Sequence, residues 1–210
     1  PQDGDDRAYV GLGVRVPRFL AGGRYVQGGV ALGGFLRGGA FEDGVLDVQL
    51  GGFSALHATG PWDWRHFAKL EYVLGIDQPD GAELVLNSEA GVRALSGDRI
   101  RGQQRLVAGL ESVAFAPFDV LGFKPAFFSF AEGGWVAPED RTPFKETLHG
   151  SLGLGLRLRN PSLVFPTLQA RAALVRTATG WDTVLSFGSG SDSVLNFRFP
   201  GVRPEVVAYR

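Results

Sequence analysis

Residues 148–159 read LHGSLGLGLRLR, and leucine or glycine fills every even-numbered position of this stretch. The odd-numbered positions carry His149, Ser151, Gly153, Gly155, Arg157 and Arg159. Successive side chains of a β-strand point to opposite faces, so this alternation gives one apolar face and one polar or small face. The stretch therefore predicts a long strand whose two faces meet different surroundings.

The same alternation recurs along the chain. Leu46 and Val48, for example, alternate with Asp47 and Gln49. We expect about nine strands, at residues 9–16, 26–37, 46–57, 68–77, 105–111, 123–136, 148–159, 166–176 and 182–199. The predicted fold class is all-β, an antiparallel up-and-down arrangement, in which a Gly-Ser run at 188–191 interrupts the last strand.

Strand length favours a membrane barrel over a soluble sandwich. Soluble strands average about 5–6 residues, whereas tilted membrane-spanning strands need about 9–11. Several of the predicted strands reach the longer range, with charged residues in the middle of their polar faces. We therefore predict a transmembrane antiparallel up-and-down β-barrel, with its apolar face toward lipid and its polar face toward a wet lumen.

The connections and the tryptophans agree with that prediction. Short connections at 18–23, 57–63, 116–122 and 160–165 alternate with longer ones at 38–44, 78–104 and 137–146. Outer-membrane barrels have short periplasmic turns and longer external loops, with aromatic residues at both interfaces. The four tryptophans fall near predicted strand ends, at Trp62, Trp64, Trp135 and Trp181.

The composition argues against several other classes of protein. The formal net charge of -1 gives no electrostatic support for nucleic-acid binding, and the absence of Cys excludes thiolate metal sites. His57, His66 and His149 are widely separated, and no serine has a nucleophile-elbow context, so we predict no metal, no cofactor and no enzymatic activity. The count of nine strands is odd, whereas closed bacterial barrels have an even number, and the chain begins at Pro1 and not at Met. We therefore expect further strands upstream of residue 1, with periplasmic domains or partners.

Three segments of the second half resemble a known family. The connection 78–104 contains GVRAL at 91–95, the next strand carries Glu111, and the strand after it contains FAEGG at 130–134. In order and spacing they resemble the C-terminal barrel of the BamA/TamA surface antigens, an outer-membrane protein assembly and translocation family. That family has a lumen-loop motif [VIL]-R-G-[FY], a lumen carboxylate on the next strand and an F-x-D-x-G motif.

The match to these motifs is incomplete. Val92 and Arg93 fit the loop motif, but Ala94 and Leu95 stand in place of Gly and an aromatic residue. The second motif is matched by Phe130, Glu132 and Gly134, with Glu in place of Asp. The resemblance covers residues 66–199, and it implies that residues 1–210 form the C-terminal portion of a 16-stranded barrel with its lumen loop at about 78–104.

The resemblance implies that Arg93 anchors the loop in the lumen by ion pairs to Glu111 and Glu132. The planar fork of an arginine suits this role because it can bridge two carboxylates. A rival remains open, because Ile100-Arg101-Gly102 also reads as [VI]-R-G. Arg101 is therefore the alternative anchor, with Gly102 as its motif glycine.

The function implied by the resemblance is assembly, insertion or translocation of proteins at the bacterial outer membrane. Its partners would be the lipid bilayer and client proteins, whose strands add at a seam by β-augmentation. One side of that seam would carry Leu195, Phe197 and Phe199. Two alternatives remain: a barrel that serves as an anchor, secretion pore or solute channel, and a soluble sandwich or ligand-binding barrel.

Overall fold

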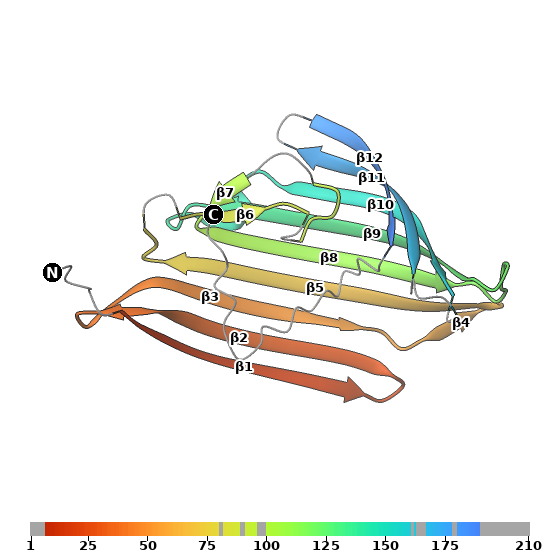
Figure 1. The fold of residues 1–210 in the computed structure, drawn as a ribbon, viewed down its shortest axis with the longest axis horizontal. Coiled ribbons are helices and arrows are strands. Elements are labelled where there is room, and N and C mark those ends of the chain that lie inside the picture. The colour runs from red at the N-terminus through yellow and green to blue at the C-terminus, as the bar shows by residue number, and fades with distance from the viewer. Residues whose placement is uncertain are drawn as a thin grey trace.

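The long strands form a single antiparallel sheet in the computed structural model, which describes residues 7–79, 82–88, 91–95, 100–160, 162, 167–177 and 180–189 (Figure 1). They are β1 (Ala8–Leu20), β2 (Arg24–Arg37), β3 (Ala40–Phe53), β5 (Trp62–Ile76), β8 (Gln104–Phe115), β9 (Lys124–Ala137), β10 (His149–Arg159), β11 (Leu168–Thr177) and β12 (Gly180–Ser189). Each pairs with the next along the chain. The predicted all-β, antiparallel up-and-down topology is confirmed.

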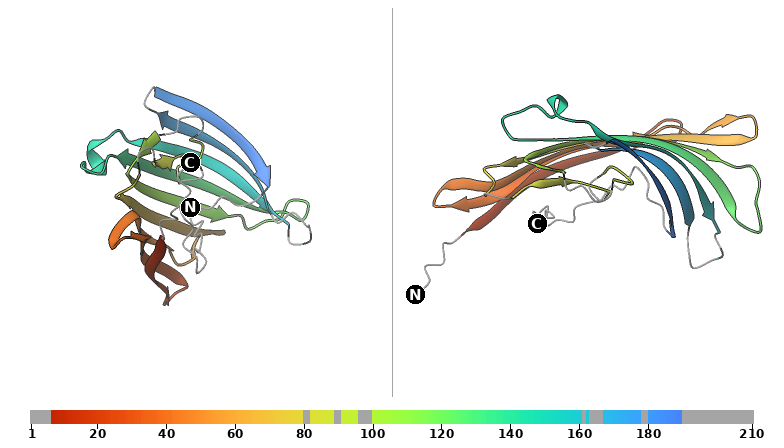
Figure 2. Two further views of the ribbon diagram at one scale, coloured as in Figure 1. Left: turned by 60° about the vertical axis from the view of Figure 1, so that its left-hand side comes forward. Right: turned by 90° about the horizontal axis from the view of Figure 1, so that it is seen from above.

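The sheet is open in the described part of the chain. Strands β1 and β12 form its two edges and do not pair with each other there. The sheet is nevertheless strongly curved, as Figure 2 shows from above, and therefore has a concave and a convex face. The predicted closure into a barrel is not seen among these residues. Of the predicted last strand, the part at 190–199, with Leu195, Phe197 and Phe199, lies outside the described residues.

Three short strands were not expected from the sequence. β4 (His57–Thr59) pairs with the beginning of β5, inside the predicted connection 57–63. β6 (Leu84–Leu86) and β7 (Ile100–Gly102) form a hairpin inside the connection 78–104, for which we predicted no strand. Strands of three residues are too short to show a recognisable alternation, and their ladders pair backbone N–H and C=O groups.

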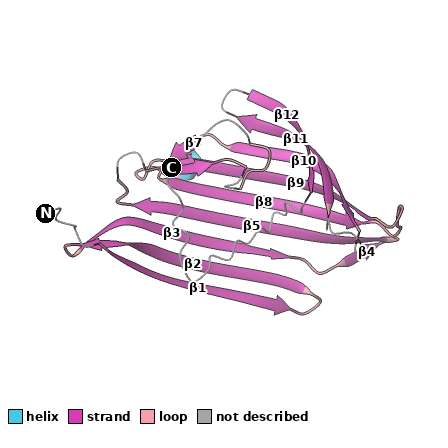
Figure 3. Ribbon diagram, viewed as in Figure 1, coloured by secondary structure: helices cyan, strands magenta, loops and turns pink. Residues whose placement is uncertain are grey.

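Regular structure other than strands is limited to a 3-10 turn, η1 (Pro143–Lys145), in the residues that the structure describes; Figure 3 shows this distribution. None of the helical structure found there has the length and hydropathy to cross a membrane.

The two parities of each strand face different surroundings. On β10, Leu152 and Leu154 are 57% and 67% exposed, whereas His149 and Ser151 are buried. The β6–β7 hairpin lies on the concave side of the sheet (Figure 2), and the buried cluster joins residues of β8 and β9 to this connection. The leucine row thus points away from the core, and within the described residues no second layer covers it.

Candidate functional site

The connection 78–104 packs against the concave face of β8 and β9. Leu84, Leu86 and Val92 are fully buried there. The guanidinium of Arg105, on β8, donates a hydrogen bond of 3.0 Å to the backbone oxygen of Val85 and pairs with Glu71 at 2.6 Å. Apolar burial and a charged side chain beneath the hairpin therefore hold this connection to the sheet.

Two motif glycines lie where the connection and the sheet approach closely. A Cβ atom at Gly134 would lie 2.7 Å from Cδ1 of Leu86 and 3.0 Å from Cγ2 of Val92. A Cβ atom at Gly102 would lie 2.7 Å from the carbonyl oxygen of Ala137. Both contacts are shorter than ordinary van der Waals contact, so a larger residue at either position would push the connection away from the sheet.

Arg93 lies between two glutamates of the sheet. Its Nε donates to Oε1 of Glu132 at 2.7 Å, and its Nη1 donates to Oε2 of Glu111 at 2.7 Å. The backbone N–H of Arg93 also donates to Oε2 of Glu132, at 2.6 Å. The side chains of Glu111 and Glu132 are 0% and 1% exposed, so these charge-assisted hydrogen bonds are shielded from water. The structure thus brings together Arg93, Glu111 and Glu132.

A second arginine, which the sequence analysis did not single out, completes the network. Arg157 on β10 reaches Glu111 across β9, with Nη1 to Oε1 at 2.7 Å and Nη2 to Oε2 at 3.1 Å. Its Nε donates to Gln169 on β11 at 2.8 Å. Glu111 therefore accepts hydrogen bonds from one arginine of the connection and one of the sheet.

Each arginine lies over an aromatic ring. The guanidinium carbon of Arg93 is 4.0 Å from the ring centroid of Phe130, and that of Arg157 is 4.0 Å from the centroid of Phe128. A Cβ atom on Gly153 would lie 2.5 Å from the Phe130 ring, and one on Gly155 would lie 2.2 Å from the Phe128 ring. Glycines on β10 therefore make room for the rings that support the two cations.

The backbone at Ala94 has the conformation that favours glycine, the residue of the family motif at this position. It adopts a φ of 66°, in the left-handed region. This is the position at which the family that the chain resembles has glycine, which takes this conformation without steric cost. Here an alanine accepts the strained backbone, directly after the arginine that holds the connection.

Arg101, the alternative anchor, does not reach this network. It lies on β7, where its side chain is 40% exposed, and it pairs with Glu83 at 3.5 Å. An exposed pair at this distance contributes about 0–1 kcal/mol. The geometry therefore favours Arg93 over Arg101 as the anchor.

The described residues offer little for other chemistry. No group of three or more His, Asp or Glu side chains in this part of the chain could hold a metal ion. The rings of His57 and His66 stack with centroids 5.1 Å apart, and Nδ1 of His66 is 2.8 Å from Oγ of Ser112, while His149 lies buried on another strand. The network around Arg93 is thus the candidate site, and what it can do is hold a long connection against a sheet.

Comparison of the chain with protein-family models, with curated proteins and with solved structures finds no match.

Proposed function

We propose that this chain belongs to a bacterial outer-membrane β-barrel that takes part in the assembly, insertion or translocation of other proteins at that membrane. The observation that carries the proposal is the distribution of residues between the two faces of the sheet. Glu111 and Glu132 are buried on the concave face, while Leu152 and Leu154 are exposed on the convex face. A membrane barrel requires this distribution, because hydrocarbon surrounds it and water fills it.

The anchored connection supports the more specific part of the proposal. In the BamA/TamA family a lumen loop is held by an arginine that faces acidic residues, and Arg93 has that position here. A connection held across the concave face would also obstruct a wide aqueous channel. This favours a role in handling proteins over conduction of solutes.

The test follows the folding of a client protein. The full chain is reconstituted into phosphatidylcholine vesicles, and a urea-unfolded eight-stranded barrel is added as the client. Its folding is measured by heat-modifiable gel mobility. We expect vesicles that contain the chain to fold the client faster than empty vesicles, and Arg93→Ala to reduce this gain.

The matched control is Arg101→Ala, which removes an arginine of the same connection from an exposed pair. We expect it to keep the gain in folding rate. An inserted chain that leaves the client rate unchanged would contradict a role in assembly, and equal effects of the two substitutions would contradict a role for the Arg93 network.

A further inference from the structure

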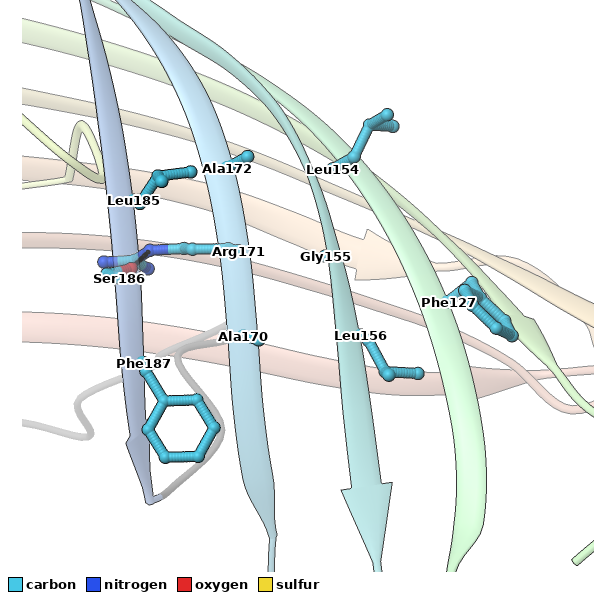
Figure 4. A pocket seen from close by; sticks show the side chains of 10 residues that line it. All are labelled: Phe127, Leu154, Gly155, Leu156, Ala170, Arg171, Ala172, Leu185, Ser186 and Phe187. Carbon is cyan, nitrogen blue, oxygen red and sulfur yellow. Dashed lines mark hydrogen bonds between the residues drawn. The ribbon is translucent and has the colours of Figure 1, made fainter. Parts of the chain in front are cut away.

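The convex face is hollowed along β11. Ala170 and Ala172 form the floor of a furrow of about 590 Å³, shown in Figure 4. In the strand register Ala172 lies between Leu154 and Leu185, and Ala170 lies between Leu156 and Phe187. Large apolar side chains of β10 and β12 thus form the two walls of the furrow, and the methyl groups of the two alanines form its floor.

The width of the furrow suits a single hydrocarbon chain. Its walls stand on strands two spacings apart, roughly 9.5 Å between backbones, and their own side chains narrow that gap. An α-helix with side chains needs about 10–12 Å, so a partner helix would not enter. A lipid acyl chain would fit and would cover apolar surface that is otherwise exposed.

A cation lies on the same side of β11, beyond the furrow and beyond Leu174, which is 47% exposed. An acyl chain that runs from the furrow to this cation passes beside Leu174, over the smaller side chain of Thr183, its register partner on β12. Arg176 is exposed, shares the outward parity of Ala170 and Ala172, and pairs in register with Trp181, itself exposed. At about 3.3 Å per residue, its Cα lies roughly 13 Å from Ala172 and 20 Å from Ala170. Because the strands of such barrels tilt, this matches the roughly 15 Å from headgroup to bilayer midplane.

We propose that the furrow along β11 binds one acyl chain of an anionic phospholipid whose phosphate pairs with Arg176. Arginine forms forked hydrogen bonds with phosphate, and tryptophan favours the headgroup level, so Arg176 and Trp181 select the headgroup while the alanine floor holds the chain. This inference rests on the proposed function, since it requires the convex face to meet lipid.

The test measures which lipid the protein retains. The full chain is inserted into vesicles of equal parts phosphatidylglycerol and phosphatidylcholine, floated to verify insertion, extracted with mild detergent, and its bound lipids are counted by mass spectrometry. Both lipids carry a phosphate, but the choline cation offsets that charge and repels Arg176, whereas phosphatidylglycerol is net anionic. We therefore expect phosphatidylglycerol to exceed phosphatidylcholine roughly fivefold, the size of the attraction of one arginine to anionic lipid. Arg176→Gln should remove this preference but keep the bound lipid, whereas Ala170→Leu with Ala172→Leu should remove bound lipid of both kinds.

Two matched controls keep the test specific. Ala68→Leu makes the same kind of change at an exposed position of β5. Arg18→Gln removes an exposed arginine that shares the outward parity of Val14 and Val16 on β1, far from the furrow. Both should leave lipid retention unchanged. If the chain inserts but retains the two lipids equally, this inference is wrong and the proposed function stands. The same conclusion follows if Leu185 cross-links two copies of the chain, because a second copy would then occupy the furrow. Failure of the chain to float with the vesicles would overturn both.

Discussion

The concave face of the sheet buries paired charged side chains beside an apolar cluster, whereas the convex face exposes large apolar side chains. The side chain of Glu111 is 0% exposed on the concave face, whereas Leu154 is 67% exposed on the convex face. In water-soluble domains charged side chains are almost never fully buried unless paired, and large apolar side chains are mostly inside. Both residues belong to one sheet, and the parity of their positions decides which face they join.

The two faces of the sheet are stabilised in different ways. A buried carboxylate is tolerated only where its partners have good geometry, and Glu111 has one from the connection and one from β10. The convex face contains no such pairs around Leu154 among the described residues, so its stability depends on the medium that touches it. Substitutions on the two faces should therefore fail for different reasons.

The largest effect is expected from Glu111→Gln. The amide keeps the shape of the side chain but removes the charge that faces Arg93 and Arg157, and breaking a buried pair costs about 3–5 kcal/mol. The free energy of unfolding in urea, measured on the reconstituted protein, should fall by that amount. Glu83→Gln is the control, because its partner Arg101 is exposed and the pair contributes about 0–1 kcal/mol. Similar losses in the two variants would show that the buried network is not stabilising.

A charge introduced on the convex face tests whether hydrocarbon or water covers that face. If hydrocarbon covers Leu154, Leu154→Arg should make folding into vesicles less favourable by about 2–4 kcal/mol, the cost near the bilayer midplane. Trp181→Arg, on the same face but at the end of β12, should cost about 0–1 kcal/mol because it lies near the headgroups. The measurement is the urea dependence of folding into vesicles. Equal and small costs at both positions would mean that water covers the convex face.

The faces of the strands could be predicted from the sequence, whereas most contacts across them could not. The alternation in 148–159 indicated which side chains of β10 lie together, because period two is a local property. The pairing of Arg157 with Glu111 depends on a side chain that crosses from β10 to β8 over β9. Register and curvature set that distance. The alternation assigns each residue to a face, but register also depends on the geometry of the turns.

The contacts of Arg93 were predicted from the resemblance to a family and not from the alternation of side chains. The spacing of Arg93, Glu111 and Glu132 resembles a family pattern, and that resemblance predicted Glu111 and Glu132 as the partners of Arg93. The same pattern favoured Arg93 by its spacing to Glu111 but left Arg101 as an alternative, since both read as part of a similar motif. The choice depends on the β6–β7 hairpin, which puts Arg101 in an exposed pair with Glu83.

The smallest effect, and the only gain, is expected from Ala94→Gly. Left-handed backbone costs a residue with a Cβ atom roughly 1–2 kcal/mol, and glycine relieves it. Glycine also makes the unfolded chain more flexible, at about 0.5–1 kcal/mol, so the net gain in the free energy of unfolding should be about 0.5–1 kcal/mol. Ala82→Gly, in the same connection but not at a positive φ, should give no gain. If both variants lose the same free energy of unfolding, then the left-handed backbone at Ala94 does not reduce the stability of the folded chain. In that case the ion pairs of Arg93 with Glu111 and Glu132 would hold the connection against the sheet without any cost from backbone strain.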